Sequence, residues 1–116
     1  MTTYTGSCHC GAIAFEVEGN IESGLACNCS MCARRGSLLW FVPRPQLKLK
    51  TPEADVGSYF FNKHAIAHRF CPTCGIHAFG EAQDPQGRAM AAVNLRCIEG
   101  LDLAAVPVRQ FDGKAL

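Results

Sequence analysis

Most of the eight cysteines lie in three short clusters whose spacing is that of metal ligands. Residues i and i+2 of an extended segment point to the same side, so Cys8 and Cys10 present two sulfurs together. Cys71 and Cys74 have the spacing of a zinc knuckle, in which a tight turn brings both sulfurs to one ion, and Gly75 can adopt the positive φ that follows. Two such pairs would complete a closed, structural four-thiolate zinc site.

The middle cluster, Cys27, Cys29 and Cys32, holds three cysteines with Cys-x-Cys-x-x-Cys spacing. This spacing can place three sulfurs around one ion and leave a fourth position open, as a catalytic zinc requires. A structural zinc completed by histidine or water is an alternative. So is a four-thiolate site in which Cys29 and Cys32 join Cys71 and Cys74. Spacing alone leaves these alternatives open.

The remaining cysteine and the histidines fit a metal site less well. Cys97 stands alone in an apolar segment and is expected in the core. His64 and His68 have finger-like spacing, but no cysteine pair precedes them at the usual distance, so we assign them no ligand role. His9 lies between two ligands and should point away from them, and His77 at most supports the knuckle.

Length and charge exclude several classes of protein. A chain of 116 residues has the size of one domain, which we expect to span residues 1–116. Its 11 basic residues balance 10 acidic ones, and no basic run exceeds Arg34-Arg35, so we expect no nucleic-acid partner. The polar N-terminus and the short apolar run at 38–42 predict neither a signal peptide nor a membrane span. We therefore expect a cytoplasmic protein whose clustered cysteines bind metal.

Short alternating and apolar runs predict a mostly β fold with little helix. Apolar and polar residues alternate over residues 13–18, as in a strand with one buried face. The other expected strands are residues 38–42, 47–49, 56–61, 66–70 and 90–97. Within the strand that leads to the knuckle, Ile66, His68 and Phe70 are expected to share one face.

One short helix is expected at residues 30–35, and it would carry the last cysteine of the middle cluster. Ser30 has the residue type of an N-cap, and Gly36 is a suitable C-terminal stop.

Four cysteine-containing segments, together with the C-terminal segment, resemble the motifs of the glutathione-dependent formaldehyde-activating enzyme family, which includes the centromere protein V-like proteins. In chain order these segments are Gly6-Ser-Cys-His-Cys-Gly11, Cys27-Asn-Cys-Ser-Met-Cys-Ala-Arg-Arg-Gly36, Phe70-Cys-Pro-Thr-Cys-Gly75, Val93-Asn-Leu-Arg-Cys-Ile98 and Phe111-Asp-Gly113. The resemblance implies an Mss-four-like fold of several short, coiled antiparallel sheets.

The resemblance also implies two zinc ions per chain. A structural zinc would be held by Cys8, Cys10, Cys71 and Cys74, and a labile active-site zinc by the middle cluster of Cys27, Cys29 and Cys32. The enzyme that gives the family its name is a carbon–sulfur lyase, which joins glutathione to formaldehyde to give S-hydroxymethylglutathione.

The hypothesis that follows is a small-molecule reaction between a thiol and an aldehyde at the middle cluster, with no membrane partner. Arg34 and Arg35 directly follow the cluster and could hold a substrate carboxylate, although they could also be solvated cations at a helix end. The alternatives are a zinc-stabilised interaction module and a thiol redox sensor. The sequence does not predict the oligomeric state or the native substrate.

Overall fold

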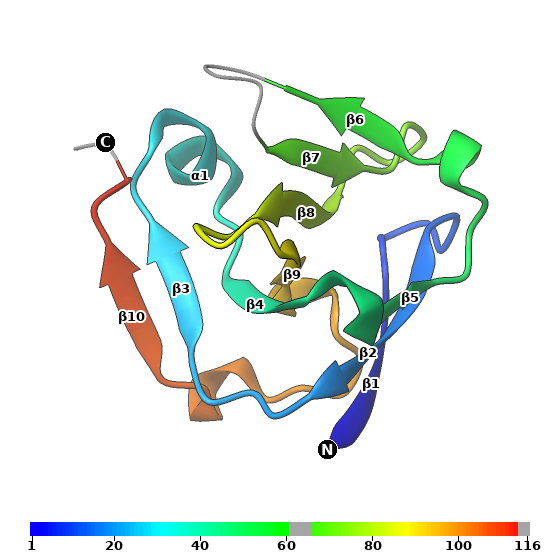
Figure 1. The fold of residues 1–116 in the computed structure, drawn as a ribbon. Coiled ribbons are helices and arrows are strands. Elements are labelled where there is room, and N and C mark those ends of the chain that lie inside the picture. The colour runs from blue at the N-terminus through cyan, green and yellow to red at the C-terminus, as the bar shows by residue number, and fades with distance from the viewer. Residues whose placement is uncertain (61–65, 114–116) are drawn as a thin grey trace.

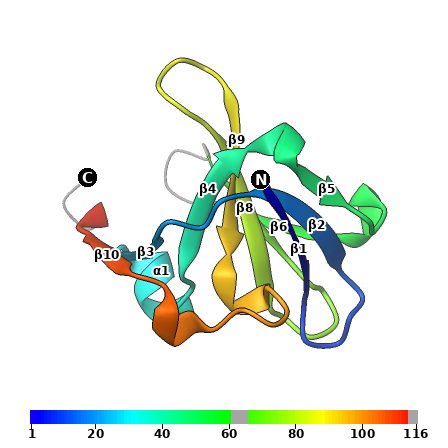
Figure 2. The same cartoon turned by 90° about the horizontal axis from the view of Figure 1, so that it is seen from below.

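The computed structural model describes residues 1–60 and 66–113, and this part of the chain is mostly β, as predicted. Its strands form one sheet of three strands and one of seven, and a short α-helix lies beside the larger sheet (Figure 1). Figure 2 shows the N-terminal strands, in blue, to one side of the larger sheet. The site residues are distributed over both sheets.

The smaller sheet contains β1 (Thr2–Ser7), β2 (Ala14–Gly19) and β5 (Leu47–Leu49), which are antiparallel, with β2 in the middle. The alternation predicted for β2 is confirmed, because Phe15 and Val17 are completely buried while the glutamates between and beside them are partly exposed. The apolar face of β2 therefore supplies the core, and its polar face is turned to solvent.

The larger sheet contains, in spatial order, β10 (Val108–Phe111), β3 (Gly24–Cys27), β4 (Leu39–Pro43), β9 (Ala89–Asn94), β8 (His77–Gln83), β7 (Ala67–Phe70) and β6 (Gly57–Tyr59). Neighbouring strands are antiparallel except β10 and β3, which are parallel. Strands β1, β3, β8 and β10 are not among those expected from the sequence. The burial of β8 and β10 does not alternate, since β10 is exposed throughout and β8 begins with a run of buried residues.

The strand expected at residues 90–97 is shorter in the structure, where it corresponds to β9 (Ala89–Asn94). It ends at Asn94, whose side chain accepts a hydrogen bond from the Arg96 N–H at 3.1 Å, and Leu95–Cys97 form a 3₁₀-helix, η3. An Asn side chain that bonds to the backbone two residues on competes with the strand ladder. Cys97 is therefore on a turn of helix and not on a strand.

The expectation that Ile66, His68 and Phe70 share one face of β7 is also wrong. A β-bulge shifts the register between Arg69 and Phe70, and His68 and Arg69 are both buried while Ile66 is 45% exposed. The expected strand at 56–61 is seen as β6, and Phe61 lies outside the described residues.

Helix α1 (Ser30–Arg35) is confirmed, but its N-cap is Cys29 and not Ser30. The Cys29 sulfur accepts a hydrogen bond from the Cys32 N–H at 3.4 Å, so a candidate metal ligand takes the place of the usual capping oxygen. Gly36, with φ of 73°, ends the helix as predicted. Within residues 1–60 and 66–113, no helix has both the length and the apolar character needed to span a bilayer.

The two sheets meet over a small core. Phe15 of β2 packs edge-on against Phe79 of β8, with ring centroids 6.3 Å apart. Above Phe79, the carboxylate of Glu81 accepts hydrogen bonds at 2.6 Å from both Arg44 and Arg69, and Arg69 is only 8% exposed. The guanidinium carbons of both arginines lie within 6 Å of the Phe79 centroid, at 5.7 and 5.9 Å. Glu53 also pairs with both arginines, at 3.5 and 3.0 Å, so two carboxylates balance the two cations that cover the edge of the core.

We predict that Glu81→Gln lowers the free energy of unfolding by about 2 kcal/mol, because buried Arg69 then keeps only the exposed Glu53 as an anionic partner. Partial burial of Glu81 opposes ionisation, but the hydrogen bonds from Arg44 and Arg69 outweigh it and lower the pKa of Glu81 below its ordinary 4.5. The carboxylate therefore stabilises the fold above pH 4.5, and this contribution is lost as the pH falls through the lowered pKa.

Urea unfolding of the wild type and the variant, compared at several pH values, measures this difference. It should be constant from neutral pH down to about pH 5 and shrink only below the ordinary carboxylate pKa. Glu18→Gln is the matched control, since its ion pair with Lys48 is exposed and longer, at 3.7 Å. Equal effects of the two substitutions would contradict the prediction.

Candidate metal centres

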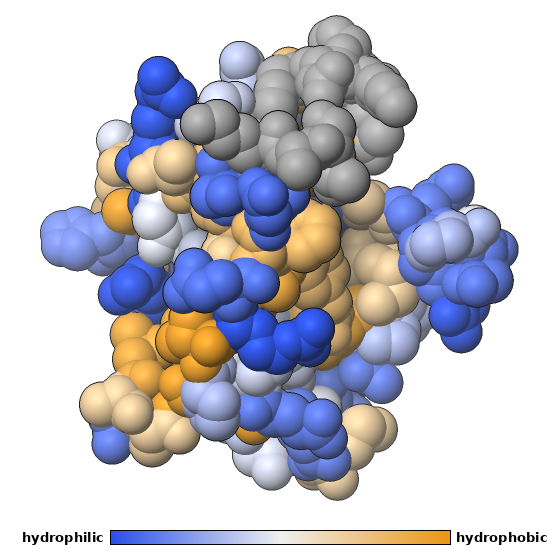
Figure 3. All heavy atoms as spheres, turned by 90° about the vertical axis from the view of Figure 1, so that its left-hand side faces the viewer, coloured by the Kyte–Doolittle hydropathy of each residue, from blue (hydrophilic) through white to orange (hydrophobic). Residues whose placement is uncertain are grey.

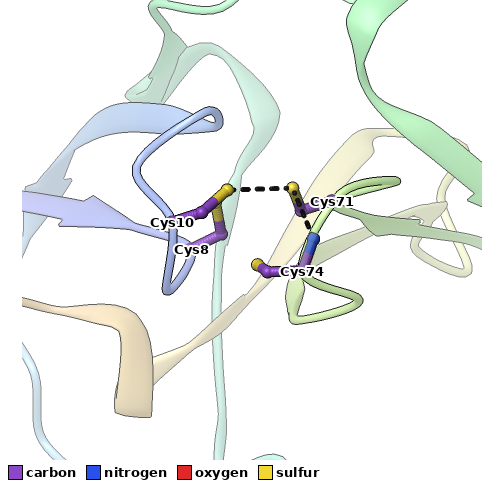
Figure 4. A group of neighbouring side chains, drawn as sticks. All are labelled: Cys8, Cys10, Cys71 and Cys74. Carbon is purple, nitrogen blue, oxygen red and sulfur yellow. Dashed lines mark hydrogen bonds between the residues drawn. The ribbon is translucent and has the colours of Figure 1, made fainter.

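Two loops from different sheets bring four cysteine sulfurs together. Cys8 and Cys10 come from the loop between β1 and β2, and Cys71 and Cys74 from the turn between β7 and β8 (Figure 4). All four sulfurs lie within 4.8 Å of one another. Cys10 Sγ is 3.7 Å from Cys8 Sγ and 3.6 Å from Cys71 Sγ. A tetrahedron of sulfurs around zinc has edges of about 3.8 Å, so these residues fit a zinc ion.

Backbone N–H groups point at these sulfurs. Cys71 Sγ accepts hydrogen bonds from the N–H groups of Thr73 and Cys74, both at 3.4 Å, and Cys8 Sγ accepts one from Ile13 at 3.3 Å. The Cys74 N–H is the foremost cause of the lowered pKa of Cys71. Hydrogen bonds to a thiolate favour the charged form, which is the form that binds metal.

The knuckle turn depends on Gly75, which has φ of 80°. Its N–H donates to the Cys71 carbonyl at 2.8 Å, and the Cys71 N–H returns a bond to the Ile76 carbonyl at 3.0 Å. Cys71 is fully buried and Cys8 is 3% exposed. Cys10 is exposed and Cys74 partly exposed, so this cluster, which we call the four-cysteine cluster, lies at the junction of the two sheets with one side open to solvent.

Cys27, Cys29 and Cys32 form the second group, which we call the trio, and their sulfurs also lie within 4.8 Å of one another. Cys27 ends β3, Cys29 caps α1, and Cys32 lies in the helix. Cys27 Sγ accepts a hydrogen bond from the Cys29 N–H at 3.5 Å. Among residues 1–60 and 66–113, no fourth Cys, His, Asp or Glu belongs to the group. The trio thus fits a metal ion that keeps one position for another ligand.

The predicted arginines lie in different environments. Arg34 is exposed, and its guanidinium donates to the Ser30 carbonyl at 3.0 Å. Arg35 is partly buried, and its Nη2 points to Cys32 Sγ at 3.9 Å. Burial raises the pKa of Cys32 to about 12, and the positive charge of Arg35 opposes that rise. Arg35 therefore favours the thiolate of Cys32 that metal binding needs.

Arg35 also connects the trio to two buried histidines. Its Nη1 lies 3.2 Å from His68 Nδ1, and its Nε donates to Ser37 Oγ at 3.1 Å. Ser37 Oγ is in turn 3.0 Å from His77 Nδ1. Because arginine only donates hydrogen bonds, His68 Nδ1 must be the acceptor. Burial, followed by the charge of Arg35, lowers the pKa of His77 to about 3, which keeps this imidazole neutral.

Several residues with contacts near the clusters carry no sequence signal of their own. Ser37 and Asn94 are both buried, and the Asn94 amide donates to the His77 carbonyl at 2.9 Å. Cys97 belongs to neither cluster, and its sulfur lies 3.6 Å from the same carbonyl. His9 is exposed, and His64 lies outside the described residues.

A cavity of about 570 Å³ lies between the knuckle and the end of α1. Its lining includes Arg35, Ser37, His77, Asn94, Arg96 and Cys97. Cys8 is the cysteine of the four-cysteine cluster that contributes to the wall, and no member of the trio does. Arg35 lines the cavity and also contacts Cys32, so this side chain lies between the cavity and the trio.

Comparisons with known proteins found a matching family model and similar proteins. The family model described as glutathione-dependent formaldehyde-activating enzyme matches residues 3–111. A protein of Colletotrichum graminicola that carries the name of the same enzyme family is 30% identical over 84 residues. This match covers 67% of the chain but only 44% of that relative, so the chain spans less than half of its length. A crystal structure of a Rhodobacter sphaeroides protein superposes with a TM-score of 0.77 at 31% identity, covering 90% of this chain and 99% of that one.

We predict that protein purified without chelator contains about two zinc ions per chain, one in each cluster. A mild chelator should remove about one zinc and leave the fold intact, because the trio lacks a fourth protein ligand, whereas removal of the second should unfold the protein. Elemental analysis and circular dichroism during stepwise chelation measure both events. Loss of both ions in one step together with the fold would contradict the assignment.

Proposed function

Because this chain belongs to the glutathione-dependent formaldehyde-activating enzyme family, we propose that it is a zinc-dependent carbon–sulfur lyase. Its substrates would be a glutathione-like thiol and an aldehyde such as formaldehyde. The observation that carries the proposal is the trio, which offers three thiolates and one open ligand position next to Arg35. The four-cysteine cluster, which supplies four thiolates and has two of its cysteines buried, would hold the structural zinc.

The proposed reaction is an addition that needs no oxidant or reductant. A zinc ion at the trio would supply a field that lowers the pKa of the substrate thiol. The sulfur lone pair then forms a C–S bond with the aldehyde carbon, the C=O π pair moves to oxygen, and the proton lost by the thiol ends on that oxygen. Cys27, Cys29 and Cys32 hold the metal, and Arg35 stabilises the Cys32 thiolate.

The cavity beside Arg35 has the size of a small-molecule site. The guanidinium of Arg35 has five N–H groups. In the described contacts, three of them point to Ser37, His68 and Cys32. The other two are left for a substrate carboxylate. Arg34 lies exposed at the end of the same helix turn and can meet a second carboxylate from solvent. We assign both arginines to substrate binding on these grounds.

A thiol redox switch is the second candidate function. Cys27 and Cys29 are partly exposed and lie close to Cys32, so loss of metal would leave thiols that can form a disulfide. Peroxide treatment distinguishes the two functions: a switch should lose about one zinc and two free thiols, whereas the lyase should keep the metal and its activity.

We predict that Cys32→Ser reduces glutathione-dependent turnover of formaldehyde to the uncatalysed rate, because the trio then has only two thiolates. Exchange NMR between glutathione and its hydroxymethyl adduct measures this rate at equilibrium. Bound zinc should fall from about two ions per chain to about one, with the fold retained by the four-cysteine cluster.

The matched control is Ala33→Ser, which adds the same hydroxyl at the next, exposed position of the helix and should leave turnover and zinc unchanged. Full turnover by the Cys32→Ser protein would refute the lyase proposal, and the zinc that it retains would show that the protein is folded.

A further inference from the structure

The C-terminal segment lies directly on the trio, although it is more than eighty residues away in sequence. Strand β10 pairs in parallel with β3, and the register places Phe111 opposite Cys27. The two strands therefore end side by side at the first cysteine of the trio, and the chain continues from β10 over the loop that holds the next one (Figure 1).

Two hydrogen bonds fix this segment to the residue between the first two cysteines. The Asn28 N–H donates to the Phe111 carbonyl at 3.2 Å, and the Asn28 amide nitrogen donates to Asp112 Oδ1 at 2.8 Å. One residue of the Cys27–Cys29 loop is thus held by both its backbone and its side chain. The second bond is charge-assisted, because its acceptor is a carboxylate.

Gly113 then passes close to the cysteines, where a larger residue would require the Cys27 side chain to move. A Cβ atom built at this position would lie 2.5 Å from Cys27 Sγ and 3.4 Å from Cys29 Cβ. Gly113 does not have a positive φ, so the requirement for glycine comes from space and not from backbone conformation. The backbone of this residue therefore covers the Cys27 side of the trio.

Little else attaches this segment to the protein. All four residues of β10 are exposed, including Val108 at 49% and Phe111 at 42%, and the strand is at the edge of the sheet. Figure 3 views the molecule from the side of β10 and β3, where apolar side chains form patches between polar ones at the surface. With little apolar burial, main-chain pairing and the Asn28 bonds must hold the segment in place.

We propose that residues 108–113, the C-terminal strap, are a working part of the trio's metal site. Asp112 and Gly113 are positioning residues: the strap fixes the Cys27–Cys29 loop in ligand geometry and covers one side of the metal. The strap leaves uncovered the other side of the trio, where Arg35 contacts Cys32. This inference rests on the proposed role of the trio as a metal site.

The test compares Gly113→Ala and Asp112→Ala with Gly80→Ala as the control, whose new methyl would meet no atom closer than 3.7 Å. Co²⁺ titration of the metal-free protein, followed by thiolate-to-metal absorption, reports the two clusters separately. We expect both strap variants to weaken Co²⁺ binding at the trio by about tenfold, as removal of supporting contacts around a metal ligand does. Binding at the four-cysteine cluster should be unchanged.

A second readout does not depend on metal. Alkylation of Cys27 by iodoacetamide in the metal-free protein, followed by mass spectrometry, should be several-fold faster in both strap variants than in the wild type or Gly80→Ala. Equal Co²⁺ affinities and equal alkylation rates in all four proteins would overturn the strap proposal. Absence of a second Co²⁺ in the wild type would instead overturn the lyase proposal, and the alkylation rates would still decide whether the strap covers Cys27.

Discussion

The rest of the structure depends on the contact between two cysteine pairs that are 61 residues apart, since Cys10 and Cys71 bring one loop from each sheet to a common point. Four sulfurs at this distance cannot all be charged without a cation. The Ala12 N–H favours the thiolate of Cys10, but the Cys71 sulfur and the other contacts outweigh it and raise the pKa of Cys10 to about 11. The Cys10 N–H is the largest cause that lowers the pKa of Cys74 to about 6. A divalent ion removes this conflict, so metal binding and docking of the sheets are coupled.

The two clusters are linked through a short chain of polar contacts. Arg35 reaches Cys32 on one side and Ser37 on the other, and Ser37 meets His77, which follows the knuckle by three residues. His77 stays neutral because it is buried near a cation. Arg35 is thereby held by neutral groups that do not offset its positive charge. The knuckle positions His77, and through Ser37 it also positions Arg35 beside the trio.

The sequence indicates which cysteines within a short segment can act as metal ligands, but it does not indicate which distant segments pair. Cysteine spacing predicts the three local groups of ligands, because a knuckle turn and a helix start are decided within a few residues. The choice of partner for Cys71 and Cys74 depends on how the sheets dock, which no local pattern contains. Strand β10 has no buried face and so gives no alternation to detect, and its contact with Cys27 depends on a parallel pairing between distant segments.

Charge and burial together explain why one cluster is suited to chemistry and the other is not. Four thiolates around a divalent ion would leave two negative charges and no open ligand position, so an anionic thiol would be repelled. Three thiolates around such an ion leave one negative charge, which Arg35 neutralises at Cys32. At the proposed metal site, an incoming thiolate would then meet a centre with no net charge. Under the proposed function, Arg35 would set the charge of the trio beside Cys32, and the strap on the Cys27 side would limit the side from which a substrate approaches.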